Sequence, residues 1–242
     1  LQTERLSQAP LASEVLILAT PSMPQLLDKS IEILSVKHLR GPNMWTYYPV
    51  IEAWIDIGDL EDYPSNLIPG FYDRLVKALP SLYEHRCSYG EAGGFLKRVE
   101  EGTWPAHILE HLTLELQNLA GIPGGFGKAR DGDRRGVYKV MVSANNEEVT
   151  LTALKYARDL YLALAQDTQD PAVLVQEIIE KLRDLGDDLL LGPSTACIVN
   201  AAEERGIPSI RLSEGNLVQL GYGAKQRRIW TAETDNTSAI SE

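Results

Sequence analysis

The chain has 242 residues, of which 44% are hydrophobic and 24% charged, so it can bury a core and has the composition of a soluble globular protein. Its formal net charge of −11 argues against a general nucleic-acid binder, and no apolar run approaches the ~20 residues that span a membrane. Two cysteines, Cys87 and Cys197, are too few for a disulfide framework, so a reducing, cytoplasmic setting is expected.

The first part of the chain predicts two strands and a short helix. Residues 1–30 are polar with scattered prolines, and we expect a leader whose role the sequence does not indicate. Residues 31–39 and 50–57 mix β-branched and apolar side chains, which predicts two strands joined by a turn rich in Gly, Pro and Asn. A helix is expected over residues 72–79, and glycines near residues 90–94 indicate a loop.

The middle of the chain predicts one long helix with a core-facing side. Thr103 is the expected N-cap, Pro105 suits the first turn, and Gly121 ends the helix. Its apolar side chains recur at spacings of three and four residues: Ile108, Leu112, Leu116 and Leu119. A glycine-rich loop is expected over residues 121–136, followed by a strand over residues 137–144.

The last part predicts three helices and a domain boundary. Residues 147–165 and 171–190 have amphipathic helical patterns. Ser194 is expected to cap a further helix that ends at Gly206, so a boundary is placed near residues 189–192. Together these elements predict an α+β fold, in which a mixed sheet carries helices on one side and is followed by a small α/β segment.

The sharpest chemical feature is the sequence HILEH, which contains His107, Glu110 and His111. Positions four apart share a helix face, so both imidazoles can reach one metal ion while Glu110 stands beside them. A catalytic zinc ion takes about three protein ligands and leaves a position open for water, whose proton a neighbouring carboxylate can accept. The order H-x-x-E-H is that of the inverzincin metallopeptidases.

The motif does not supply the third ligand. The candidates are His85 and Cys87, in the sequence YEHRCS, and Glu115, one helical turn beyond His111. A simpler interpretation is that His and Glu side chains on a helix only form hydrogen bonds with their neighbours or with solvent. The motif by itself favours this simpler interpretation.

Two basic segments are candidates for anion binding. Residues 124–136 combine glycines with Lys128, Arg130, Arg134 and Arg135, so backbone N–H groups and positive charge could meet an anion. No Walker sequence is present, and Asp131 and Asp133 partly offset the arginines, so a plain surface loop is the simpler alternative. The second segment, residues 216–230, carries Lys225, Arg227 and Arg228, and is equally consistent with an exposed edge.

Taken together, several blocks of the chain resemble the cyanophycin synthetase family. The blocks that resemble its N-terminal domain are residues 39–45, 62–88, 93–121 and 125–140. Residues 191–240, which begin LGPSTACIVNAAEERGIPSIRL, resemble the segment that leads into its ATP-grasp domain. The resemblance implies three parts: a leader (1–30), a cyanophycin synthetase-like N-terminal domain (31–190) and a truncated start of the ATP-grasp region (191–242).

The resemblance also implies a function. The family joins aspartate and arginine into cyanophycin, a branched polymer, and its N-terminal domain is understood to hold the growing chain. In some members this domain also has a metal-dependent hydrolytic site with the H-x-x-E-H motif, which trims polymer into primers. The resemblance therefore implies that His107 and His111 bind Zn²⁺, that Glu110 is the general base, and that the basic residues after Gly127 contact cyanophycin.

The chain is expected to lack the synthetic machinery of the parent enzyme. It ends before the nucleotide-binding core of an ATP-grasp domain and has no Mur-ligase-like P-loop, so ATP and Mg²⁺ are assigned to those domains of a homo-oligomeric parent. Two alternatives to hydrolysis stay open at this point. In one the domain only anchors the polymer, and in the other it is a scaffold for oligomerisation.

Overall fold

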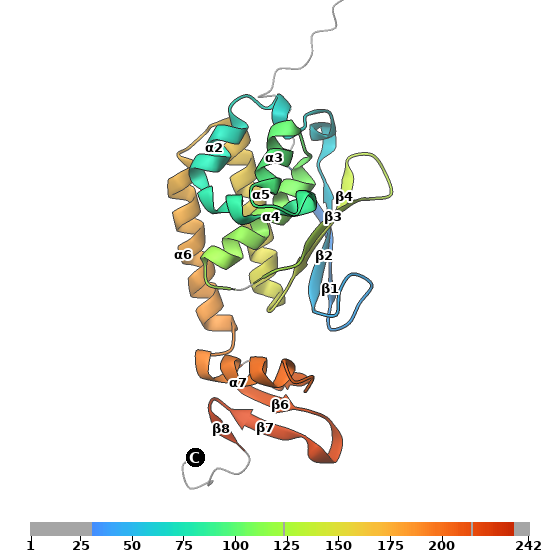
Figure 1. The fold of residues 1–242 in the computed structure, drawn as a ribbon, viewed down its shortest axis with the longest axis vertical. Coiled ribbons are helices and arrows are strands. Elements are labelled where there is room, and N and C mark those ends of the chain that lie inside the picture. The colour runs from blue at the N-terminus through green and yellow to red at the C-terminus, as the bar shows by residue number, and fades with distance from the viewer. Residues whose placement is uncertain (1–30, 123, 214, 235–242) are drawn as a thin grey trace, which may run out of the picture.

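A computed structural model describes residues 31–122, 124–213 and 215–234. It contains a sheet covered by helices on one side, and a smaller unit at the C-terminal end (Figure 1). The predicted α+β class is therefore confirmed. The leader expected over residues 1–30 lies outside the described residues, as does the end of the chain from residue 235.

The larger unit has a four-stranded sheet of order β1-β2-β4-β3. Its strands are β1 (Glu32–Leu39), β2 (Val50–Asp56), β3 (Gly127–Asp131) and β4 (Val137–Ser143). Every pairing is antiparallel, so the expectation of a mixed sheet was wrong in strand direction. Loops join β1 directly to β2 and β3 directly to β4, which favours antiparallel pairing because parallel neighbours need a long crossover. The antiparallel pairing of β2 with β4 joins strands that are far apart in the chain, so only the structure shows its direction.

Strand β3 lies inside the stretch that was expected to be a loop. Its glycines indicate a turn when read locally, but Lys128, Ala129 and Arg130 pair with β4 in regular antiparallel register. Long-range pairing therefore overrides the local glycine signal. A similar correction applies to Gly94, where the expected loop gives way to the helix α3 (Gly94–Glu101).

The helical layer packs on one face of the sheet, as Figure 1 shows. Its main helices are α2 (Phe71–Ala78), α4 (Pro105–Leu119), α5 (Glu147–Gln166) and α6 (Pro171–Leu189), with the short 3₁₀ helices η1 (Gly58–Asp62), η2 (Ser65–Leu67), η3 (Pro80–Glu84) and η4 (Cys87–Tyr89). Helix α4 is the centre of this layer and contacts β3, β4, α5 and α6. Its predicted bounds are close, but its N-cap is Trp104 and not Thr103.

One continuous core joins the two layers. Alternate residues of β2, namely Ile51, Ala53 and Ile55, point toward apolar side chains of α4 and α5. At about 25 cal/mol per Å² of buried apolar surface, this core is the main stabilising contribution to the larger unit. Asn146 and Asp170 cap α5 and α6 through side-chain oxygens that accept backbone N–H bonds.

The smaller unit contains one helix and a second antiparallel sheet of order β5-β6-β7-β8. Its elements are α7 (Pro193–Glu203), β5 (Ser209–Arg211), β6 (Leu217–Leu220), the short helix η5 (Gly223–Lys225), β7 (Arg227–Trp230) and β8 (Glu233–Thr234). The N-cap of α7 is Gly192, with Pro193 at the first position, so the expectation of Ser194 as the cap was wrong. The basic residues Lys225, Arg227 and Arg228 lie here and not in the larger unit.

Within the part of the chain that the structure describes, no helix combines the length and the apolarity needed to cross a membrane. Both cysteines are free thiols.

Candidate metal centre

Helix α4 presents the HILEH residues toward the segment that contains η3 and η4. Pro105 starts the helix at its first position, and the regular turns that follow place His107 and His111 one turn apart. The two imidazole centroids are 4.9 Å apart. Glu110 and His111 are both buried. A buried carboxylate is rare in proteins unless it has a partner or a function.

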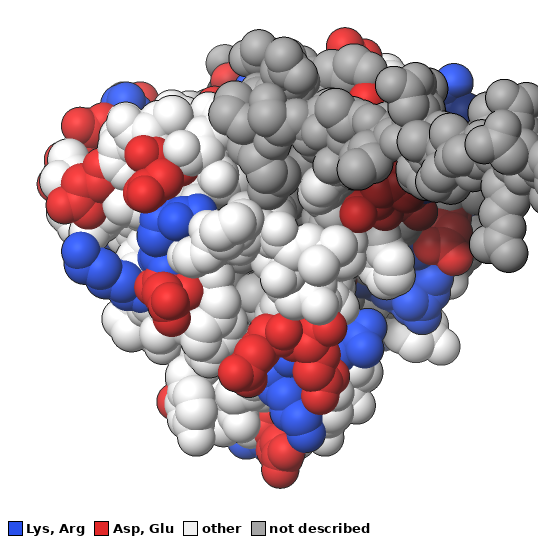
Figure 2. All heavy atoms as spheres, turned by 90° about the horizontal axis from the view of Figure 1, so that it is seen from above, with Lys and Arg blue, Asp and Glu red and all other residues white. Residues whose placement is uncertain are grey.

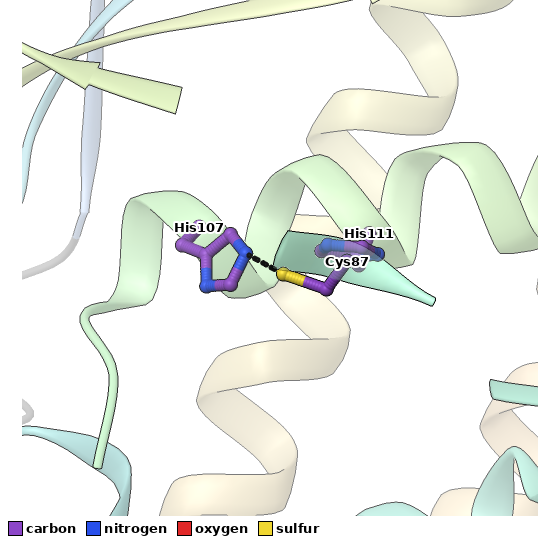
Figure 3. A group of neighbouring side chains, drawn as sticks. All are labelled: Cys87, His107 and His111. Carbon is purple, nitrogen blue, oxygen red and sulfur yellow. Dashed lines mark hydrogen bonds between the residues drawn. The ribbon is translucent and has the colours of Figure 1, made fainter. Parts of the chain in front are cut away.

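Cys87 completes a group of three donor atoms with these histidines. Its sulfur lies 3.2 Å from Nε2 of His107 (Figure 3), and the donor atoms of Cys87, His107 and His111 all lie within 4.8 Å of one another. Zinc binds thiolate at about 2.3 Å and imidazole at about 2.0–2.1 Å, so ligand atoms that surround one ion lie at separations of this order. Among the described residues, this is the group that could hold a metal ion.

The other two candidates for the third ligand form a hydrogen-bonded chain with His111. Nε2 of His85 lies 2.7 Å from Oε2 of Glu115, and Nδ1 of His85 lies 2.8 Å from Nδ1 of His111. An ionised carboxylate only accepts, so His85 carries its proton on Nε2. Nδ1 of His85 then accepts from Nδ1 of His111, which leaves the lone pair of His111 on Nε2, the nitrogen 3.9 Å from Glu110.

Thr103 holds His107 in the corresponding way. Its hydroxyl oxygen lies 2.8 Å from Nδ1 of His107, which leaves Nε2 of that ring facing the Cys87 sulfur. The ring of Phe95 stacks on His111 with centroids 4.0 Å apart. Both histidines are thus oriented through Nδ1 and present Nε2, an arrangement that is common around bound metals.

Burial sets the charge state of these groups. Burial lowers the pKa of His107 to about 4, with a further contribution from the charge of Arg98. Burial also lowers the pKa of His111 to about 2, with further contributions from His107 and His85. Both rings are therefore neutral at pH 7 and have a lone pair to offer. Burial alone would raise the pKa of Glu115, but hydrogen bonds from His85 and Ser81 lower it overall.

The pKa of Glu110 is shifted upward, in contrast to the lowered pKa values of the two histidines. Burial raises its pKa to about 7, against smaller effects of the Ala129 backbone N–H and of Arg130. A carboxyl group that titrates near neutral pH can accept and return a proton. Ala129 belongs to β3, so the sheet lies beside the carboxylate that the motif places on α4.

A cavity of about 680 Å³ opens over this centre. It is bordered by the metal group and by several charged residues: Arg86, Arg98, Glu110, Lys128, Arg130 and Asp131. Of the four basic residues expected to bind polymer, Lys128 and Arg130 border this cavity. Arg134 and Arg135 lie in the β3–β4 turn and pair with Asp56 and Asp62, respectively.

Some contacts of this centre were not predicted from the sequence. Thr103 was expected only as a helix cap, and no role was predicted for Phe95 or Arg98. The spacing of Thr103 and His107, four residues apart at the start of a helix, was a usable signal for the Thr103 contact. The approach of Phe95 and Arg98 had no local signal, because both belong to α3, which was not predicted.

The sequence of the chain is similar to those of known proteins. Residues 52–166 match the model of the cyanophycin synthase-like N-terminal domain. The chain contains this domain. It is 44% identical over 212 residues to cyanophycin synthetase of Trichormus variabilis, 44% over 216 residues to that of Geminocystis herdmanii, and 46% over 202 residues to that of a Synechocystis species. These alignments cover 87%, 87% and 82% of the chain.

The chain spans about a quarter of the length of these relatives: 24%, 24% and 23%, respectively. The matched family region starts within β2 and ends at the last residue of α5, so it includes Cys87 and the whole HILEH motif. The candidate metal centre thus lies inside the cyanophycin synthase-like domain and not in the smaller C-terminal unit.

Proposed function

We propose that this domain binds cyanophycin and hydrolyses it at a zinc site formed by Cys87, His107 and His111. The observation that carries the proposal is the convergence of these three donors next to a buried carboxylate, at the base of a cavity. One thiolate and two imidazoles form a donor set that suits zinc. A zinc ion bound there would lower the pKa of a water molecule and polarise a carbonyl group.

Glu110 is the proposed general base. Its pKa near 7 allows it to take a proton from the attacking water and to return that proton to the amine that leaves. Thr103 and the Glu115–His85 pair hold the two histidines, so the protein orients the site without help from solvent. The cavity wall keeps Arg98 and Arg130 close to the position of the substrate.

The charge distribution supports a zwitterionic polymer as the substrate. The cavity is bordered by four basic and two acidic side chains, which can meet the carboxylates and guanidinium groups of cyanophycin through charge-assisted hydrogen bonds. On the face shown in Figure 2, basic and acidic side chains lie next to one another and do not form a large patch of one sign.

The test is hydrolysis of soluble cyanophycin by the purified chain with added zinc. We expect shorter polymer chains to accumulate, and we expect Glu110→Gln to lower the rate by at least about 100-fold while zinc stays bound. Equal cleavage by wild type and Glu110→Gln would show that the base is assigned wrongly. Absence of cleavage by a zinc-loaded wild-type chain would contradict the hydrolytic function as a whole.

A second function, polymer anchoring without cleavage, is supported by the register of the sheet. Lys128 pairs with Met141 and Arg130 pairs with Lys139, so the three basic side chains belong to the sheet face away from the helices. There Lys128 and Lys139 lie over the rings of Trp45 and Trp54, at 5.8 and 4.4 Å. Such a face can hold the carboxylates of a polymer beside the cavity, which Lys128 and Arg130 also border.

Charge reversal tests whether this sheet face binds polymer. We expect Lys128→Glu with Arg130→Glu to weaken polymer binding at least about tenfold and to reduce its salt dependence, because two cations are replaced by anions. Lys155→Glu with Lys181→Glu is the matched control, since both lysines are exposed on helices. Equal polymer affinity in the two double variants would contradict anchoring on this face.

A further inference from the structure

Among the described residues, strand β3 has one edge without a partner strand, because it ends the order β1-β2-β4-β3. The hydrogen bonds that flank the β3–β4 ladder show which residues face that edge. The backbone N–H of Ser143 donates to Phe126, and the N–H of Gly132 donates to Val137. Hydrogen-bonded pairs alternate in an antiparallel ladder, so Lys128 and Arg130 also bond to β4.

The backbone groups of Gly127, Ala129 and Asp131 therefore point away from β4. All three residues border the cavity, and the N–H of Ala129 is the group that acts on the pKa of Glu110. The outward N–H of Ala129 is thus directed at the carboxylate proposed as the base, and the outward groups of Gly127 and Asp131 lie on either side of this contact. Free edges of this kind are usually blocked or covered in proteins, since they pair readily with another extended chain.

Gly127 shows how closely this edge approaches α4. A Cβ atom at this position would lie 2.7 Å from Oε1 of Glu110 and 2.8 Å from Cδ1 of Leu114. The missing side chain lets the strand lie directly against the helix that carries the metal ligands. As a result, a chain that follows the edge of β3 passes Glu110 and the two histidines on its way through the cavity.

We propose that the free edge of β3 binds the main chain of an extended polypeptide by adding it as a fifth strand to the sheet. The inference rests on the proposed function, because poly-aspartate is the main chain of cyanophycin. The outward N–H and C=O groups of Gly127 and Asp131 then recognise the peptide backbone, while the basic side chains of the cavity wall meet its carboxylates. Main-chain pairing places an amide bond of the substrate beside Glu110.

The first experiment removes an outward N–H group from the protein. Asp131→Pro deletes the N–H that faces the cavity and leaves the bonds to β4 in place, and edge strands tolerate proline in this orientation. Asp131→Asn is the matched control, since it changes the side chain but keeps the N–H. Both variants lose the Asp131 carboxylate, so the difference between them reports the N–H alone. In a Glu110→Gln background, which prevents cleavage, we expect the Kd of an arginine-decorated aspartate decamer to be about fivefold higher for Asp131→Pro than for Asp131→Asn.

The second experiment changes the ligand and leaves the protein unaltered. Synthetic decamers carry a single N-methyl group at one backbone amide, moved along the chain, and their affinities are measured by fluorescence anisotropy. Edge pairing predicts that central N-methylation weakens binding about fivefold, whereas methylation of the terminal amide does not. This arm stays decisive if Asp131→Pro fails to fold.

The outcomes separate the two claims. Equal affinity of the unmodified and of all the N-methylated decamers overturns edge pairing and leaves polymer binding intact. Failure of the unmodified decamer to bind overturns the proposed function, and the edge inference with it. Weaker binding of Asp131→Asn to the same extent as Asp131→Pro assigns the effect to the carboxylate and also overturns edge pairing.

Discussion

At the scale of single residues, Cys87 is the candidate donor that the fold brings to the two histidines of the motif. It lies in η4, twenty positions before His107, and its φ angle of 50° holds the backbone in the left-handed region. A non-glycine residue in this conformation costs free energy and is kept only where the surroundings require it. The contact between the Cys87 sulfur and His107 is one such requirement.

We predict that Cys87→Ser removes tight zinc binding from the chain. A hydroxyl group is a much weaker zinc ligand than a thiolate. Changes to the residues that contact metal ligands typically reduce metal affinity about 10- to 100-fold, so loss of a ligand itself should reduce zinc affinity by more than this. Competition with a chelating dye measures the affinity. Cys197→Ser is the matched control, because Cys197 is an exposed free thiol in the smaller unit. An equal effect of the two changes would exclude Cys87 as a ligand.

The Glu115–His85–His111 chain gives a second prediction at this scale. Glu115→Gln removes the charge that fixes the His85 proton on Nε2, and it therefore loosens the tautomer of His111. We expect about a tenfold loss of zinc affinity, together with a mixed tautomer signal of His111 in ¹⁵N NMR spectra. Glu100→Gln, an equal charge change on an exposed site of α3, should change neither measurement. An unaltered tautomer in Glu115→Gln would disprove the relay.

At the scale of elements, the first turn of α5 is tied to the end of β1. Glu147 pairs with His38 and Arg40, and Nη2 of Arg40 donates to it at 2.8 Å. The hydrogen bond from Arg40 is the largest cause of a Glu147 pKa of about 2, although partial burial acts in the other direction. A carboxylate in the first turn of a helix is also favoured by the helix dipole.

This link predicts a pH dependence of stability. The folded-state pKa of Glu147 lies below its ordinary value of 4.5, so its stabilising contribution is complete above about pH 4.5 and disappears as the pH falls toward 2. We expect Glu147→Gln to lower the melting temperature by a few degrees at pH 7 and by almost nothing near pH 2. Glu148→Gln, the exposed neighbour in the same turn, is the control for the helix dipole. A pH-independent difference between Glu147→Gln and wild type would contradict the ion pair.

At the scale of the whole molecule, the two units differ in how much core they have. The larger unit has one continuous core, whereas the cluster of buried residues in the described part of the smaller unit is Val199, Val218 and Ile229. Apolar side chains such as Tyr222 and Trp230 stay exposed in the smaller unit. A core of this size contributes little stability, so the larger unit should fold without it.

We predict that a chain ending at residue 190 keeps the metal centre. Its melting temperature should lie within a few degrees of that of the full chain, and it should bind zinc with the same stoichiometry, because the contacts of the metal centre lie within the larger unit. Calorimetry and metal analysis provide the measurements. Unfolding of the shortened chain would show that the boundary predicted near residues 189–192 does not separate independent units.

The sequence by itself determined the features that depend on local periodicity. The repeat of Ile108, Leu112 and Leu116 predicts α4, and the same helical turn places His107, Glu110 and His111 together. The α+β class and the likeness to cyanophycin synthetases also follow from the chain alone. All of these depend on residues that are near one another in the sequence.

Only the tertiary structure shows which of the candidate donors lie together. From the sequence the third ligand could equally be Cys87, His85 or Glu115. In the structure η3 and η4 pack against α4. This packing places the Cys87 sulfur beside His107, whereas His85 and Glu115 lie behind His111. In the same way β3 became a strand only through its pairing with β4, against its local glycine signal. The physical reason is that helical periodicity is a property of neighbouring residues, whereas ligand convergence and strand pairing depend on long-range packing.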